Sequence, residues 1–224
     1  MPKCLQHALE TLEQEMRTLA GLVETATDQA VRALREGNAE LAREVIAGES
    51  RIDREENHLD EECLKILALY QPVATDLRRV TVAMMLATDL ERMGDLAEKI
   101  AGHVLQGVNP PSVPVPEKLL QMAELTAQMV RQSLQAFFTL DMEQARVVWD
   151  LDDEVDRFND EVIAELLELM HGAPEMIDVG LSLFSATRHL ERIADHATNI
   201  SEEVLYLGGG KIVRHCPDAV HLHA

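Results

Sequence analysis

Aromatic residues and paired cysteines are scarce in this chain of 224 residues. Aromatic side chains make up only 3% of the sequence, whereas leucine, alanine, glutamate and methionine are abundant, which favours helix packing over a β-sheet. The three cysteines, Cys4, Cys63 and Cys216, lie far apart and form no Cys-x-x-Cys pair. A disulfide framework and a thiolate zinc site are therefore not indicated, and a reducing compartment is expected.

Long apolar runs are also missing. No run approaches the length of about 18 residues that a membrane span requires, and the first residues lead into an amphipathic helix rather than a signal peptide. We therefore expect a cytoplasmic protein. Its formal net charge of -20 repels nucleic acid and anionic lipid, so we expect no nucleic-acid partner. The same charge favours basic protein surfaces or cations as partners.

Prolines divide the chain into helical stretches, because a proline inside a helix removes a hydrogen bond and clashes with the preceding turn. The eight prolines lie at positions 2, 72, 110, 111, 114, 116, 174 and 217. Capping signals at Gly37-Asn38 and at Leu140-Asp141 divide two of the proline-free stretches again. Six helices are predicted, over residues 5–36, 38–70, 73–107, 117–140, 141–171 and 174–207.

The order of these helices predicts an all-α fold of two tandem, sequence-similar three-helix bundles. We expect the first bundle over residues 1–108, a stiff proline-rich linker over 109–116, the second bundle over 117–210 and a C-terminal tail over 211–224. A single six-helix bundle with a proline-rich corner is the alternative.

A repeated motif supports the division into two bundles. Residues 89–95 read Asp-Leu-Glu-Arg-Met-Gly-Asp, and residues 189–195 read His-Leu-Glu-Arg-Ile-Ala-Asp, 100 positions later. The second and fifth helices correspond in the same way, with an offset of 103. The second, third, fifth and sixth helices each carry two acids that stand four residues apart and so share one helix face. These pairs are Glu49 and Asp53, Glu91 and Asp95, Asp152 and Asp156, and Glu191 and Asp195.

The repeated acid pairs have two interpretations. Like charges at this spacing destabilise a helix by about 0.2 to 0.5 kcal/mol per pair, so a compensating cation is expected. Local arginines would supply it in an ordinary salt-bridged surface, since Arg92, Arg188 and Arg192 each stand three residues before an acid. Alternatively, the acids form a site for a hard cation, because such ions prefer oxygen ligands.

Helical angles place Glu91, Asp95 and Glu98 about 140° from the apolar stripe of their helix, so that they face outward. Asp53 and Asp156 lie nearer the flank of their stripes, so neighbouring helices bring two pairs together over a surface groove. In the second repeat Asn199 extends the row of oxygen ligands, whereas Lys99 stands at the equivalent position of the first. We therefore expect the second site to bind cations more strongly. Gly94 and Ala194, at equivalent positions, predict a close approach of a neighbouring helix.

Evidence for an enzyme is weaker. Two Glu-x-x-His strings, ending at His58 and His171, have the spacing that di-iron bundles use, but they are not equivalent in the repeat. No glycine-rich phosphate loop and no nucleophile-base string is present. A carboxylate-bridged metal enzyme and a metal-free helical scaffold remain as alternatives.

Several strings of the chain resemble the PhoU family of phosphate-transport regulators. They are residues 71–78 (Gln-Pro-Val-Ala-Thr-Asp-Leu-Arg), 90–95, 190–200 and the closing Tyr-Leu-Gly at 206–208. The match runs in the right order over nearly the whole chain. Ala194 replaces the glycine that is usual in the second motif, which is a change from one small residue to another.

This resemblance implies a cytoplasmic, non-enzymatic adaptor between the cytoplasmic subunits of a phosphate ABC transporter and a sensor histidine kinase. Such a protein keeps phosphate-starvation signalling off when phosphate is plentiful, reaches the membrane only through protein partners, and is often a homodimer. The resemblance also implies divalent or trivalent metal ions, such as iron, manganese, magnesium or zinc. Their ligands would be Glu49, Asp53, Glu91, Asp95, Asp152, Asp156, Glu191 and Asp195, with Asn199 as our own addition.

Overall fold

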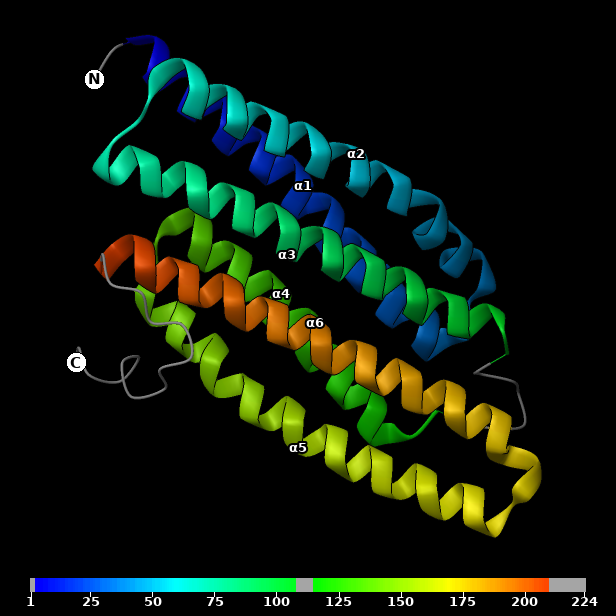
Figure 1. Ribbon diagram of the computed structural model, residues 1–224. Coiled ribbons are helices and arrows are strands. Elements are labelled where there is room, and N and C mark those ends of the chain that lie inside the picture. The colour runs from blue at the N-terminus through cyan, green and yellow to red at the C-terminus, as the bar shows by residue number, and fades with distance from the viewer. Residues whose placement is uncertain (1–2, 108–114, 210–224) are drawn as a thin grey trace.

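The computed structural model describes residues 3–107 and 115–209, and this part of the chain is almost entirely α-helical (Figure 1). Its elements are α1 (Lys3–Glu36), α2 (Ala39–Tyr70), α3 (Ala74–Leu105), α4 (Glu117–Thr139), α5 (Met142–Gly172), the short 3₁₀ helix η1 (Pro174–Met176) and α6 (Ile177–Gly209). The six helices expected from the prolines and capping signals are confirmed. The expected tail and most of the expected linker lie outside the described residues.

The two repeats turn their first corner in the same way. The side chain of Asn38 accepts hydrogen bonds from the backbone N–H groups two and three residues later, and Asp141 does the same at the start of α5. The residue before each cap has a left-handed backbone, with φ of 62° at Gly37 and 53° at Leu140. Each corner therefore ends one helix and starts the next within two residues.

Helices α1, α2 and α3 pack against one another, and so do α4, α5 and α6. The expected fold of two tandem three-helix bundles is confirmed. The bundles meet where α3 packs against α6 and α1 packs against α4, and α3 and α6 run antiparallel (Figure 1). Buried apolar side chains of both bundles belong to one continuous cluster. The bundles are therefore two halves of one core, and domain limits at 108 and 117 stay a prediction.

Approximate twofold symmetry relates the two bundles at this junction. Asp28 of α1 pairs with Arg131 of α4 at 2.6 Å, and Arg35 of α1 pairs with Glu124 of α4. The partners exchange roles, because Glu124 follows Asp28 by 96 positions and Arg131 follows Arg35 by the same offset. Reciprocal contacts of this kind are typical of interfaces between identical subunits.

The apolar stripe of α3 decides where its acids lie. Leu86, Leu90, Met93, Ala97 and Ile100 are all at most 1% exposed, as the spacing of three and four residues predicts. Burial of a leucine side chain of this kind contributes about 1.5 to 3 kcal/mol. The acids of the repeated motif therefore lie on another side of α3 from this stripe, where Glu91 and Asp95 are partly buried.

Candidate metal sites

Three carboxylates of the first bundle converge between α2 and α3. One oxygen from each of Glu49, Asp53 and Asp95 lies within 4.8 Å of the other two, and all three residues are partly buried. Ligand oxygens of one hard cation lie at most about 4 to 5 Å apart, because each is about 2.0 to 2.6 Å from the ion. The spacing of these oxygens therefore suits a single cation held by two helices.

Like-charge repulsion accompanies this convergence. Burial raises the pKa of the Glu49 carboxyl, and a hydrogen bond with Asp53 and the charge of that residue raise it further. Burial also raises the pKa of Glu91, followed by the charges of Asp95 and Asp53. The ionised acids are therefore costly to hold together, and a bound cation would remove that cost.

Two further acids, Glu56 and Glu98, belong to this group. Burial raises the pKa of Glu56, followed by the charges of Asp60, Glu91 and Asp53. The charge of Glu98 acts on Glu49. Both lie three residues beyond a motif aspartate, a spacing that keeps them on the same helix face and signals their position. We call the six residues the first acid cluster: Glu49, Asp53, Glu56, Glu91, Asp95 and Glu98.

The second bundle brings its four motif acids together between α5 and α6. Burial, followed by the charges of Asp195 and Asp156, raises the pKa of Asp152 to about 6. Burial and then Asp195 raise the pKa of Glu191, and burial and then Asp156 raise that of Asp195. We call these four residues the second acid cluster. Within the described ranges, only the first cluster has three acids at the mutual spacing of ligands.

Neutral groups replace two acids in the second cluster. Asn159 stands at the position equivalent to Glu56, and Thr198 at the position equivalent to Glu98. Asn159 is 6% exposed and its Oδ1 atom has no hydrogen-bond partner among the described residues, while Thr198 hydrogen-bonds the side chain of Asp152. With six acids against four, charge favours the first bundle as the stronger cation site, whereas the sequence argument favoured the second.

Asn199 does not lie among the second cluster as we expected. Its side-chain amide donates a hydrogen bond to Asp89 of α3 at 3.4 Å, and Asp89 also contacts His196 Nδ1 at 2.8 Å. Asn199 is therefore turned toward the other bundle, and Thr198 is the residue of α6 that extends the acid row. A helix position one residue further along points about 100° away, which explains the difference.

Local ion pairs account for only part of the acid charge. Lys99 pairs with Asp95 at 3.2 Å, and Arg188 pairs with Glu191 at 3.0 Å. Neither Arg92 nor Arg192 forms an ion pair within the described ranges. Moreover, the Oε2 atom of Glu191 is buried without a hydrogen-bond partner in the described part of the molecule. From a distance, the charges of Arg92 and Arg192 partly offset the raised pKa of Glu91 and Asp195. Most of the clustered carboxylates nevertheless have no direct ion pair within the described ranges, and the residues fit a bound cation.

Close helix approach beside the first cluster is confirmed. A methyl group added to Gly94 would lie 2.9 Å from Cδ1 and 3.1 Å from Cγ2 of Ile52. Gly94 and Ile52 directly precede Asp95 and Asp53, so the missing side chain lets α2 approach α3 where the carboxylates meet. In the second bundle the equivalent positions hold Ala194 and Val155, both fully buried.

The other metal-type side chains of the described region form no comparable group. His58 is exposed and contacts Glu15 at 3.3 Å, and His171 is exposed at the end of α5. Burial raises the pKa of the Cys63 thiol to about 12, so it stays protonated. Nor does any described helix combine the length and apolarity that crossing a membrane requires.

Comparison with known proteins gives consistent matches. The family model described as the PhoU domain matches residues 16–104 and again residues 119–204, one match in each bundle. A Pseudomonas putida protein named phosphate-specific transport system accessory protein PhoU homolog is 38% identical over 92% of this chain and 81% of its own length. The Escherichia coli (strain K12) protein named phosphate-specific transport system accessory protein PhoU is 31% identical over 92% of this chain and 86% of its own.

Solved structures agree. The crystal structure of PhoU from Pseudomonas aeruginosa has a TM-score of 0.87 and 35% sequence identity, over 92% of this chain and 99% of that one. The phosphate transport system regulatory protein PhoU from Streptococcus pneumoniae has a TM-score of 0.86 and 32% identity, over 93% and 99%. With the duplicated motif, the fold and these matches in agreement, the chain belongs to the PhoU family.

Proposed function

We propose that this protein is a cytoplasmic accessory regulator of phosphate uptake, which keeps phosphate-starvation signalling off when phosphate is plentiful. Family membership supports the accessory role, because the relatives named above are accessory proteins of a phosphate-specific transport system. The partners would be the cytoplasmic subunits of a phosphate ABC transporter and a sensor histidine kinase, with the protein as an adaptor between them. It would act as a homodimer.

The observation that carries the metal-binding part of this proposal is the presence of equivalent acid clusters in both bundles. Glu49, Asp53 and Asp95 would hold one cation, with Glu91 beside them. Asp152, Asp156, Glu191 and Asp195 would hold another. Iron, manganese, magnesium and zinc all accept carboxylate oxygen, and a bound cation would offset the like-charge repulsion in each cluster. Held in this way, two helices of each bundle keep a fixed spacing.

Metal content tests this part directly. The purified protein would be loaded with iron or manganese, dialysed and analysed by mass spectrometry. The double variants Asp53→Asn/Asp95→Asn and Asp156→Asn/Asp195→Asn should each remove the metal of one bundle. Exchange of Glu168, an exposed acid outside both clusters, for glutamine is the matched control and should change nothing. A wild-type protein that carries no metal, and whose melting temperature is unmoved by a chelator, would refute metal binding.

Regulation is tested separately in cells that carry a phosphate-responsive reporter. Deletion of the gene should switch the reporter on in phosphate-rich medium, and the wild-type gene should switch it off again. An unchanged reporter would refute the regulatory role, whatever the metal content. Comparison of the two double variants in the same cells then shows whether metal is needed for regulation.

A further inference from the structure

A cavity of about 400 Å³ opens between the two bundles, away from both acid clusters. It lies where the beginning of α3, the end of α4 and the end of α6 meet α1. Its apolar walls come from Met16, Phe137, Phe138, Leu140 and Leu207. A volume of this size accepts one or two large side chains of a binding partner.

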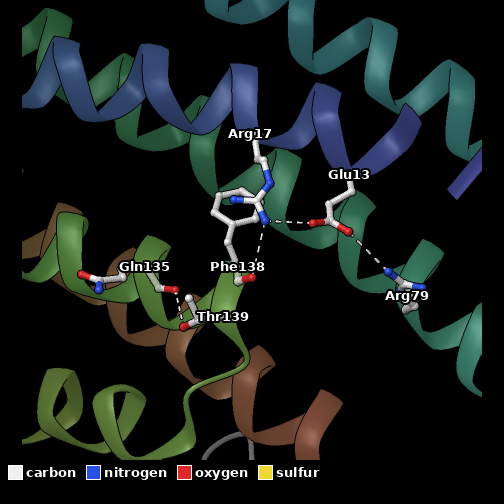
Figure 2. Close-up of polar contacts among 6 residues, drawn as sticks. All are labelled: Glu13, Arg17, Arg79, Gln135, Phe138 and Thr139. Carbon is white, nitrogen blue, oxygen red and sulfur yellow. Dashed lines mark hydrogen bonds and ion pairs between the residues drawn. The ribbon is translucent and has the colours of Figure 1, made fainter. Parts of the chain in front are cut away.

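Charged side chains lie along one wall of the cavity. Arg79 and Arg17 both pair with the single carboxylate of Glu13, at 3.4 and 2.8 Å, and the Arg17 guanidinium also lies 4.3 Å from the centre of the Phe138 ring (Figure 2). Two guanidinium groups thus share one carboxylate. Arg79 lines the cavity and has further N–H donors beyond the one that bonds to Glu13. Glu13 and Arg79 line the cavity and Arg17 lies beside it, so two guanidinium groups and one carboxylate leave a net charge of +1 here, in a chain of net charge -20.

The backbone of Leu140 supplies an independent observation. This residue lines the cavity, is 54% exposed and has a φ of 53°, in the left-handed region where the side chain of a leucine is strained. At the same corner of the first repeat, Gly37 adopts this conformation without that strain. The fold therefore does not require a leucine at this corner, and the side chain contributes little to the core.

Exposed apolar surface continues beyond the cavity. Met142 is 38% exposed, and its Sδ atom would lie 2.7 Å from a methyl group added to Gly208, next to Leu207. A second hollow, of about 440 Å³, lies on the other side of the stacked Arg17 and Phe138 and extends toward Arg131. A small molecule would leave most of this surface uncovered, whereas a protein segment would cover it.

We propose that this groove, centred on Leu140, Phe138 and Arg79, docks a segment of a partner protein that carries two or more large apolar side chains beside a carboxylate. The apolar side chains enter the cavity and the carboxylate accepts hydrogen bonds from Arg79. This partner chemistry differs from the basic surface that the net charge alone favours. The groove lies outside the acid clusters, so the proposal stands or falls independently of metal binding.

A phage library of random 12-residue peptides, selected against the intact chelator-treated protein, tests the proposal. Peptides enriched over empty resin should contain large apolar residues and a net negative charge. Their affinity, measured by fluorescence anisotropy, should fall about tenfold in Arg79→Gln, as expected for the loss of a charge-assisted contact. Enrichment of basic peptides, or of none, would overturn the proposal.

Leu140→Gly separates docking from stability. This variant places a glycine at the corner of the second repeat, as Gly37 stands at the corner of the first. Its melting temperature should therefore stay equal or rise, while its affinity for the peptides falls several-fold. The matched control is Gln71→Gly, because Gln71 is exposed, has a φ of 46° and does not line the cavity. It should have a similar effect on melting and none on affinity. Unchanged affinity in Leu140→Gly would count against the proposal.

Sedimentation of the same variants examines a second copy of the chain as the occupant. The wild-type protein and Leu140→Gly should have the same oligomeric state. Dissociation of a dimer in Leu140→Gly alone would assign the groove to self-association and overturn the proposed partner.

Discussion

Replacement of Gly94 by alanine should destabilise the protein, although alanine is the better helix former. The substitution gains about 1 kcal/mol of helix propensity in the middle of α3. The added methyl group would lie 2.9 and 3.1 Å from two atoms of Ile52, and overpacking of this kind costs about 1 to 3 kcal/mol. We expect a net loss of about 1 kcal/mol.

Exchange of Ile52 for valine should reverse this loss, because the methyl group that it removes, Cδ1, is the atom nearest to the new one. Alone, Ile52→Val should cost about 1 kcal/mol through the lost burial. In the double variant the clash is relieved, and the stability should return to within about 0.5 kcal/mol of wild type. Bundle two already has this combination at the equivalent positions, Ala194 and Val155.

Urea unfolding of the wild type, the two single variants and the double variant, followed by circular dichroism, gives the three changes in the free energy of unfolding that a double-mutant cycle needs. The expected coupling between the two substitutions is about 2 kcal/mol in the stabilising direction, which is well above experimental scatter. Free energies that add to within about 0.5 kcal/mol would show that Gly94 and Ile52 are not in steric conflict, and would refute the argument.

Three further outcomes follow from burial and charge. In chelated protein, the pKa of Asp152, raised to about 6, means that the folded state holds the proton of this group more tightly, so the contribution of Asp152 to stability should rise as the pH falls from 7 to 4. At pH 8 the free energy of unfolding of Asp152→Asn should exceed that of wild type by on the order of 1 kcal/mol, a small value because partial exposure screens the repulsion. Near pH 4 the two proteins should be equally stable, and thermal melting measures both. Burial, and then the charge of His103, lowers the pKa of His189 to about 4, so the contribution of His189 to stability is lost as the pH falls from 6.5 to 4. His189→Gln should remove that contribution to the pH dependence in the same assay. Residues 1–107, expressed alone, should unfold at a lower urea concentration than the whole chain, because the core is continuous across both bundles. When this fragment is mixed with residues 115–224, gel filtration should show that the two fragments form a complex. Equal stability of the fragment and the whole chain would contradict this.

The sequence contains enough information for the helices and the repeat. Prolines and the caps at Asn38 and Asp141 locate the helix ends, because both act through local backbone geometry. The buried stripe of α3 follows from spacing alone. The four motif acid pairs were also identified, since an equal register in two repeats is unlikely to arise by chance.

Contacts between helices were harder to predict. The spacing of residues gives the face on which a side chain lies, but not the helix that this face meets. For this reason Asn199 was assigned to the acid row, whereas it bonds to Asp89 across the bundle junction. Glu56 was missed for the same reason, because its place in the first cluster depends on how α2 lies beside α3. The strained backbone of Leu140 has no signature in the sequence beyond a leucine where glycine is usual.

The duplication lets the chain serve as its own comparison, since equivalent positions have the same backbone and differ only in side chain. Some differences compensate each other in packing: Gly94 with Ile52 in one bundle and Ala194 with Val155 in the other contain the same number of side-chain carbons. Packing does not require the exchange of Gly37 for Leu140, which adds backbone strain and exposed apolar surface. A difference that costs stability without a compensating contact in the fold points to a role outside it. By this criterion, the corner at Leu140 is where the second bundle has acquired a task that the first does not share.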